Sequence, residues 1–170
     1  MGDDTSPEED LLALYDRALP VVYGYLADRC GNRSTAEDLA AETFLAAVRT
    51  LRASSPTVVS VPWLVGVARH KLADHWRREA RGERLLHAIG DTMDDAEDPW
   101  DAKVDALAAA EVLSRLSNDH RAALTLRYVD GLPVAEVAEL LGRSLEATEA
   151  LLVRAKAAYR RASLEGGGDA

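Results

Sequence analysis

The chain has 170 residues, of which 48% are hydrophobic and only 5% aromatic, and its formal net charge is −9. This length fits one ordinary domain or two small ones, and an apolar content made mostly of Ala, Leu and Val predicts an all-α fold. A single cysteine excludes an intrachain disulfide and indicates a reducing, cytoplasmic compartment. No apolar run approaches the roughly 18 residues of a membrane-spanning helix, so we expect no membrane insertion.

The chain begins with an acidic tail and a helix. Residues 1–9 are rich in acidic side chains and predict a disordered tail. Apolar residues then recur at helical spacing from Leu11 to about Cys30, and Gly31 ends this predicted helix. Pro20, inside it, favours a kink or a split of the helix.

The second predicted helix runs from Ser34 to about Leu51. Ser34 and Glu37 match a capping box, in which the Ser side chain caps the helix and the acid three residues later bonds back to it. The apolar side chains expected to face the core are Leu39, Phe44, Leu45 and Val48. Residues 53–62 are rich in Ser and Pro and predict a loop.

The third predicted helix begins near Trp63, ends near Arg81 and is amphipathic. At about 100° per residue, its core-facing side chains are Val65, Ala68, Leu72 and Trp76. Another arc of about 120° carries His70, Lys71, Asp74, Arg77, Arg78 and Arg81. Because a local basic stripe matters more than total charge, this helix is compatible with a nucleic-acid partner; a merely solvated helix face is the alternative.

An acidic segment separates the two halves of the chain. Residues 91–105 carry seven acids against one base, Lys103, and show no helical periodicity. Such a stretch is typical of a flexible linker. The prediction is therefore two small helical domains, and the expected parts after the tail are 10–81, an acidic linker 82–103, 104–164 and a disordered tail 165–170.

The second domain has the pattern of a helix-turn-helix. A helix His120–Val129 precedes one with Pro133 at its first position, and Gly142 and Ser144 form a turn into a third helix that Ser144 caps. The cations at or on that third helix are Arg143, Arg154, Lys156, Arg160 and Arg161. Because DNA phosphates need cations, the pattern predicts DNA binding; three-helix packing without DNA contact is the alternative.

Four stretches of the chain, in order, resemble the sigma factors of the extracytoplasmic-function (ECF) type, over about residues 11–163. They are Leu14-Tyr15 with residues 22–26, residues 36–45, residues 62–78, and residues 124–132 with 137–144. Each stretch alone is moderately specific, but their order and two-domain spacing make the resemblance strong.

The resemblance implies a bacterial factor that binds core RNA polymerase and directs promoter recognition, DNA melting and transcription initiation, without being an enzyme. Core RNA polymerase and promoter DNA are the implied partners, and members of the family often have an anti-sigma factor as well. We expect no cofactor and no small-molecule substrate. The sequence has no Gly-rich phosphate loop, and its four histidines and Cys30 lack metal-ligand spacing. The protein is expected in the cytoplasm, associated with the nucleoid when bound to polymerase.

The resemblance also assigns three groups of site residues. The group expected to contact core polymerase is Asp38, Leu39, Glu42 and Phe44. The group expected to bind the minus-ten element is Trp63, Arg69, His70, Lys71, Asp74, Arg77 and Arg78, beside a loop that could hold a base taken out of the stack. The group expected at the minus-thirty-five element is Arg143, Ser144, Glu146, Ala147, Glu149, Ala150, Arg154 and Lys156.

The chain departs from the family pattern at three of its positions. Glu149 and Leu151 stand where the family usually has basic residues, and His70 stands where Asn is common. We therefore expect weak or unusual recognition of the upstream element. For Glu149 the favoured explanation is stabilisation of the helix dipole, and hydrogen bonding to cytosine N4 is the alternative.

A stand-alone helix-turn-helix regulator is the nearest alternative function. It would account for residues 104–164 and would predict a dimer on a palindromic site. It does not account for the family-like patterns of residues 36–45 and 62–78.

Overall fold

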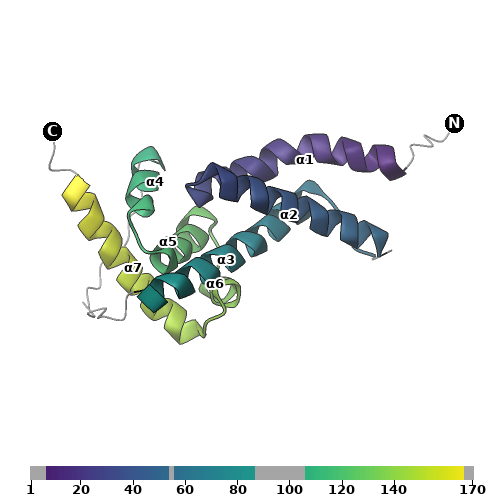
Figure 1. The fold of residues 1–170 in the computed structure, drawn as a ribbon. Coiled ribbons are helices and arrows are strands. Elements are labelled where there is room, and N and C mark those ends of the chain that lie inside the picture. The colour runs from purple at the N-terminus through teal and green to yellow at the C-terminus, as the bar shows by residue number, and fades with distance from the viewer. Residues whose placement is uncertain (1–6, 54–55, 87–105, 167–170) are drawn as a thin grey trace. The chain divides into compact units, whose positions relative to one another are not determined.

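The structure, a computed structural model, describes residues 7–53, 56–86 and 106–166. Every regular element within these ranges is a helix, which confirms the all-α class (Figure 1). The chain divides into two compact units, Met1–Leu72 and Ala73–Ala170. Among the described helices, none has both the length and the apolar character that crossing a membrane requires.

The first unit contains α1 (Pro7–Cys30), α2 (Arg33–Arg52) and the first half of α3 (Val61–Leu86). Helices α1 and α2 lie side by side (Figure 1). The side chains of α1 that are fully buried are Ala18, Val22 and Leu26, and those of α2 that are buried are Ala36, Leu39, Ala40, Thr43 and Ala47. Because the inner face of α2 consists mostly of small residues, its backbone can approach its neighbours closely.

The core-facing side of α2 differs from the prediction at one position. Leu39 is buried as expected and Phe44 and Val48 are half-buried, but Leu45 is 53% exposed. Leu45 lies about 180° around the helix from the buried Ala36, so it cannot reach the same core. The prediction was wrong here because it placed the large apolar side chains inside, whereas Ala and Thr occupy that face.

The start of α2 also differs from the capping box expected at Ser34. The cap is Asn32, whose backbone is extended (φ −143°) and whose side-chain oxygen accepts hydrogen bonds from the backbone N–H groups of Ser34 (2.9 Å) and Thr35 (3.4 Å). Glu37 pairs instead with Arg33, at 2.7 Å. The helix therefore begins one residue before Ser34, and Asn32 satisfies two of its otherwise unpaired N–H groups.

Helix α1 is longer and more regular than expected. It begins at Pro7, so residues 7–9 are helical although they were predicted to belong to the tail, and it continues through Pro20 without a split. Pro20 is exposed, so its ring lies on the outer side of the helix. The rest of the predicted tail lies outside the described residues.

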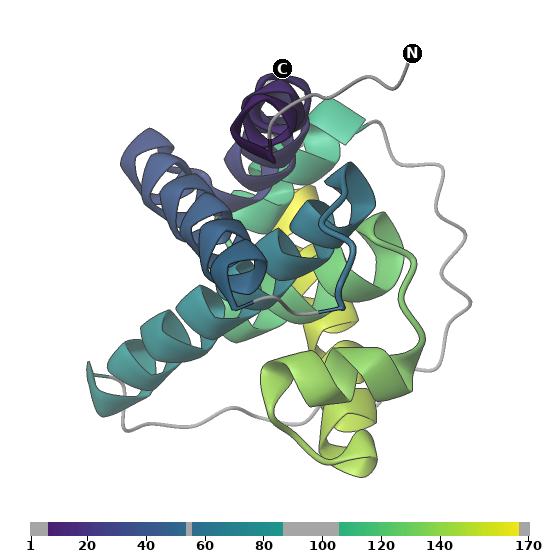
Figure 2. The ribbon, with the colours of Figure 1, turned by 90° about the vertical axis from the view of Figure 1, so that its right-hand side faces the viewer.

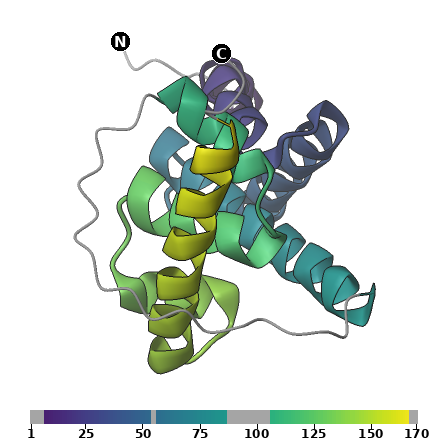
Figure 3. The same cartoon turned by 90° about the vertical axis from the view of Figure 1, so that its left-hand side faces the viewer.

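The second unit contains the end of α3, then α4 (Ala106–Ser114), α5 (Asn118–Leu124), η1 (Thr125–Val129), α6 (Val134–Leu141) and α7 (Leu145–Gly166). Helix α7 packs against α4, α5 and α6 (Figure 3). A core cluster joins Leu116, Leu124, Ala155 and Tyr159, with Val112, Leu113, Ala158 and Ala162 packed against it. Four apolar residues of α7, Leu151, Leu152, Ala155 and Tyr159, are all buried.

The helix predicted over His120–Val129 consists of two elements. Helix α5 ends at Leu124, and the π-helical turn η1 continues the coil, with the N–H of Asp130 donating to the carbonyl of Thr125 at 2.9 Å. The predicted linker is also shorter at its start, because α3 extends to Leu86. Residues 87–105, which hold most of the predicted linker, lie outside the described residues, as does the predicted tail after Gly166.

Candidate functional site

The exposed face of α2 carries two carboxylates one helical turn apart. Asp38 and Glu42 are both exposed, and their i, i+4 spacing places them on one side of the helix. Leu39, predicted to join them in contacting a partner, is only 3% exposed and belongs to the core. Phe44 is half-buried and packs against Tyr15 of α1, with the two rings tilted by 58° and their centroids 4.7 Å apart. Of the four residues predicted to contact polymerase, the two with carboxylates are therefore the ones that are exposed.

Glu42 also connects this acidic face to α3. Its carboxylate lies 3.3 Å from the ammonium of Lys71. Lys71 was predicted to bind DNA and Glu42 to contact polymerase, so the structure brings together two residues assigned to different partners. No sequence signal pairs them, because they belong to separate helices.

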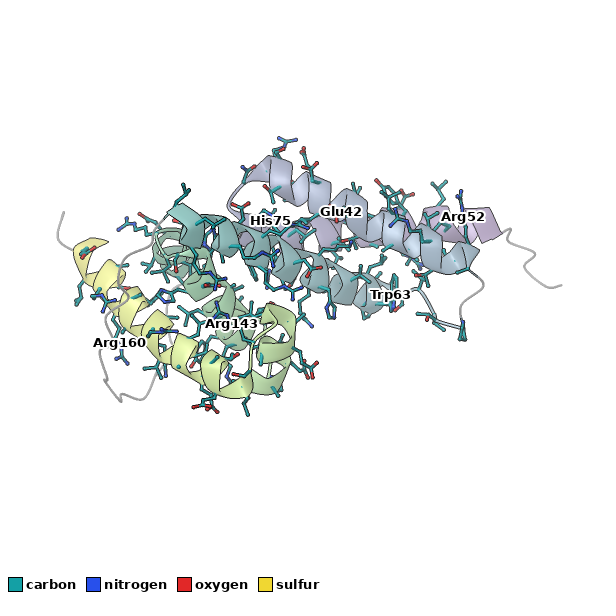
Figure 4. All side chains as sticks on the ribbon, turned by 60° about the horizontal axis from the view of Figure 1, so that its bottom comes forward. Glu42, Arg52, Trp63, His75, Arg143 and Arg160 are labelled. Carbon is teal, nitrogen blue, oxygen red and sulfur yellow. The ribbon has the colours of Figure 1, made fainter. Side chains whose placement is uncertain are left out.

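The segment before α3 ends in a serine cap. The Ser60 hydroxyl accepts a hydrogen bond from the backbone N–H of Trp63 at 3.3 Å, and the Ser60 carbonyl accepts one from Leu64 at 2.9 Å. The helix consequently begins at Val61, slightly earlier than predicted. Trp63 is half-buried at this end of α3, and Val58 in the preceding segment is 80% exposed. An indole in this position has a packed side and a side that faces solvent (Figure 4).

Helix α3 has the amphipathic pattern that its sequence predicts. Ala68, Leu72 and Trp76 are buried, while Val65 is half-buried. Within the predicted basic arc the exposed residues are His70, Arg78 and Arg81, and the half-buried ones are Lys71, Asp74 and Arg77. Arg77 donates a hydrogen bond to Asp74, which neutralises part of the stripe. Arg69, the remaining cation of the predicted minus-ten group, is half-buried.

The turn between α6 and α7 has the geometry of a helix-turn-helix. Gly142 adopts a left-handed conformation (φ 63°) that a side chain would disfavour, and its N–H bonds back to Glu139. The Ser144 hydroxyl accepts a hydrogen bond from the N–H of Ala147 at 3.1 Å, which confirms Ser144 as the cap of α7. Pro133 precedes α6 as its cap residue, one position before the predicted one. Helix α6 and the start of α7 consequently lie next to each other (Figure 2).

The outward face of α7 carries acids where the helix begins. Glu146, Glu149 and Ala150 are exposed, while Thr148 and Leu152 are buried and face the core. Leu151, one of the two departures from the family pattern, is only 3% exposed. That departure therefore affects packing, whereas Glu149 changes the surface that faces outward.

The cations of this domain surround that acidic face. Arg143, in the turn, donates a hydrogen bond to Asp119 of α5 at 2.8 Å, and both side chains are largely enclosed (21% and 24% exposed). Arg154 and Lys156 are half-buried, and the Nε of Arg154 has no hydrogen-bond partner among the described residues. Arg160 lies farther along α7 from Arg143 (Figure 4). No pattern in the sequence indicates Asp119, because its partner Arg143 lies on another element.

Comparison with known proteins agrees with this two-part organisation. The model of Sigma-70 region 2 matches residues 14–82, and that of Sigma-70, region 4 matches residues 106–158. The chain is 36% identical over 149 residues to the ECF RNA polymerase sigma factor BldN of Streptomyces coelicolor, covering 84% of this chain and 56% of that protein. It is 31% identical over 137 residues to the ECF RNA polymerase sigma factor SigL of Mycobacterium tuberculosis, covering 76% and 75%.

Two further comparisons concern length and fold. The probable RNA polymerase sigma factor RfaY of Xanthomonas campestris is 33% identical over 163 residues, 84% of this chain and 40% of that protein, so the chain spans about half the length of BldN and RfaY. The sigma factor RpoE of Bartonella quintana, solved in complex with the anti-sigma factor NepR, aligns with a TM-score of 0.53 at 18% identity, covering 94% of this chain and 99% of that one. The likeness to RpoE shows a shared fold.

Proposed function

Because the chain belongs to the ECF-type RNA polymerase sigma factors, we propose that it binds core RNA polymerase and directs promoter recognition, DNA melting and transcription initiation. The observation that carries this proposal is the presence, in one chain and in order, of a region 2 match and a region 4 match. A stand-alone regulator would need only the second of these. Sigma factors are not enzymes, so the residues act by binding alone.

The proposed contact with core polymerase uses the carboxylates of Asp38 and Glu42. Both are exposed on one side of α2 and suit a partner that presents basic side chains. Phe44, half-buried against Tyr15, supports the surface between α1 and α2. Leu39 acts from the core, by holding α2 in place.

The proposed minus-ten contact uses α3 and the segment before it. Arg78 and His70 are exposed and can approach phosphates or bases directly, while Lys71 and Arg77 must first leave Glu42 and Asp74. Arg69 adds a half-buried cation to the same helix. The half-buried Trp63 could stack on a base that has left the duplex, which would offset an unstacking cost of a few kcal/mol.

The proposed upstream contact places α7 in the major groove. Its capped N-terminus and the guanidinium of Arg143 are suited to phosphates, and Arg154 and Lys156 flank the outward face. Base contacts would come from that outward face. With these partners, the protein would act in the cytoplasm, on the nucleoid.

The test is transcription by purified core polymerase from the source organism on sheared genomic DNA, with and without this protein. Sequencing of the 5′ ends should reveal new, reproducible start sites that share upstream motifs. Core polymerase alone is the control. Co-elution with core polymerase without new starts would indicate a polymerase-binding regulator. If the protein produced no new starts and did not co-elute with core polymerase, the proposal would be refuted in favour of a stand-alone DNA-binding protein.

A further inference from the structure

Stabilisation of the helix dipole does not explain the presence of a carboxylate at Glu149 of α7. Helix α7 begins at Leu145, so Glu146 lies in its first turn and Glu149 lies beyond it. The favourable effect of a carboxylate on the helix dipole falls off within the first turn. The dipole explanation favoured from the sequence therefore holds for Glu146 and fails for Glu149.

The surroundings of Glu149 leave its carboxylate available to a ligand. The side chain is exposed, and it has no hydrogen-bond or ion-pair partner among the described residues. Its neighbours on the outward face, Glu146, Ala150 and Val153, include no cation. A carboxylate on a face that enters a DNA groove is repelled by phosphates, so it needs a hydrogen-bond donor on a base to be tolerated.

The major groove offers few such donors. Guanine presents two acceptors and thymine an acceptor and a methyl group, so neither suits a carboxylate. Adenine presents an amino group, but its N7 acceptor lies beside it and repels the second carboxylate oxygen. Cytosine presents the N4 amino group without a neighbouring acceptor, and it is therefore the base that best fits Glu149.

We propose that Glu149 is a specificity-determining residue, which selects a cytosine in the upstream promoter element by accepting a hydrogen bond from its N4 amino group. This inference rests on the proposed function, because it requires α7 to lie in the major groove of promoter DNA. The adjacent Ala150 and Val153 are small and apolar and leave room for the base edge.

The experiment uses holoenzyme formed with the full chain and a promoter library with a randomised upstream element. Transcripts are sequenced to obtain base preferences for the native chain, for Glu149→Gln and for the matched control Glu165→Gln, which removes the same charge from an exposed position at the far end of α7. The native chain should prefer cytosine at one position of one strand by about tenfold or more. In Glu149→Gln the preference at that position should shift to adenine, since Gln bonds adenine N6 and N7 together, whereas Glu165→Gln should keep cytosine.

The outcomes separate the inference from the function on which it rests. Starts that depend on the protein but show the same upstream preferences in the native chain and in Glu149→Gln would overturn the inference alone. An equal loss of cytosine preference in both variants would also overturn it, because the effect would then be one of charge. Failure of the native chain to produce any new start would refute the proposed function, and the inference with it.

Discussion

Single side chains contribute to stability and, in the proposed function, to binding, and the Asp119–Arg143 pair is the clearest case. It joins α5 to the turn before α7 through a hydrogen bond of 2.8 Å between two largely enclosed side chains. A charge-assisted bond in such a setting contributes more than an exposed pair. The same bond holds a guanidinium that the proposed function assigns to DNA.

Asp119→Asn is expected to lower the free energy of unfolding by about 1 kcal/mol, because it removes the charge that holds Arg143. Urea denaturation of the full chain measures this. Glu111→Gln, which removes one partner of the exposed Arg115–Glu111 pair at 2.6 Å, is the matched control and should change stability by less than about 0.5 kcal/mol. Equal effects in the two variants would show that the enclosure of the Asp119–Arg143 pair does not increase its contribution to stability.

Glu42→Gln is expected to weaken binding to core polymerase several-fold, because it removes a charge that suits a basic partner. The free energy of unfolding should change little, because the ion pair of Glu42 with Lys71 at 3.3 Å is partly exposed and such pairs contribute little to stability. Affinity can be measured by fluorescence anisotropy of labelled protein with core polymerase. Glu37→Gln removes an exposed acid of the same helix that is already paired with Arg33 and should leave the affinity unchanged. Equal losses of affinity would point to a general effect of charge on α2.

At the scale of the element, helix ends decide where the functional faces begin. Asn32 starts α2 and Ser60 and Ser144 start α3 and α7, each by accepting a hydrogen bond from a backbone N–H group that the helix leaves unpaired. Gly142 ends α6 in a left-handed conformation and so sets the angle at which α7 departs. These local bonds fix the residue at which each helix starts or ends, and they thereby help to fix which of its side chains point outward.

Asn32→Ala is expected to destabilise the protein by about 1 kcal/mol, since two N–H groups of α2 lose their acceptor. Ser34→Ala is the matched control: it changes the residue expected from the sequence to be the cap, and it should cost much less. Thermal or urea denaturation compares the two. A larger loss of stability for Ser34→Ala than for Asn32→Ala would indicate that Ser34 is the cap, as the capping-box pattern predicts.

At the scale of the whole molecule, charge is distributed unevenly along a chain whose net charge is −9. The basic side chains predicted to meet DNA are partly occupied by acids of the same protein, as with Lys71, Arg77 and Arg143. Net negative charge also repels duplex DNA over the distance that salt leaves unscreened. DNA binding should therefore depend on the assembled polymerase.

The free chain is expected to bind a promoter duplex at least 100-fold more weakly than the holoenzyme at physiological salt, because its net charge opposes binding and Lys71, Arg77 and Arg143 are paired with acids. Anisotropy of a labelled duplex, titrated with free protein and with holoenzyme, measures both affinities. A random duplex of the same length is the control for sequence-independent binding. Tight, salt-resistant binding by the free chain would contradict this expectation.

Much of the fold could be predicted from the sequence, because the signals involved are local. Composition predicted the all-α class, and helical periodicity predicted the buried face of α3 at Ala68, Leu72 and Trp76. Gly142 and Ser144 predicted the turn into α7, since a left-handed glycine and a capping hydroxyl act within a few residues of the chain. The ordered stretches also determined the family, which the matches to regions 2 and 4 then showed.

Only the tertiary structure decided which side chains are available for function. It left Leu45 on the outside, because α2 packs through its small residues instead of its large ones. It paired Glu42 with Lys71 and Asp119 with Arg143, contacts between helices that no spacing in the sequence encodes. It also left Glu149 exposed, beyond the first turn of α7. Periodicity is a property of one helix, whereas burial and charge pairing depend on its neighbours, and for that reason the sequence alone could not supply them.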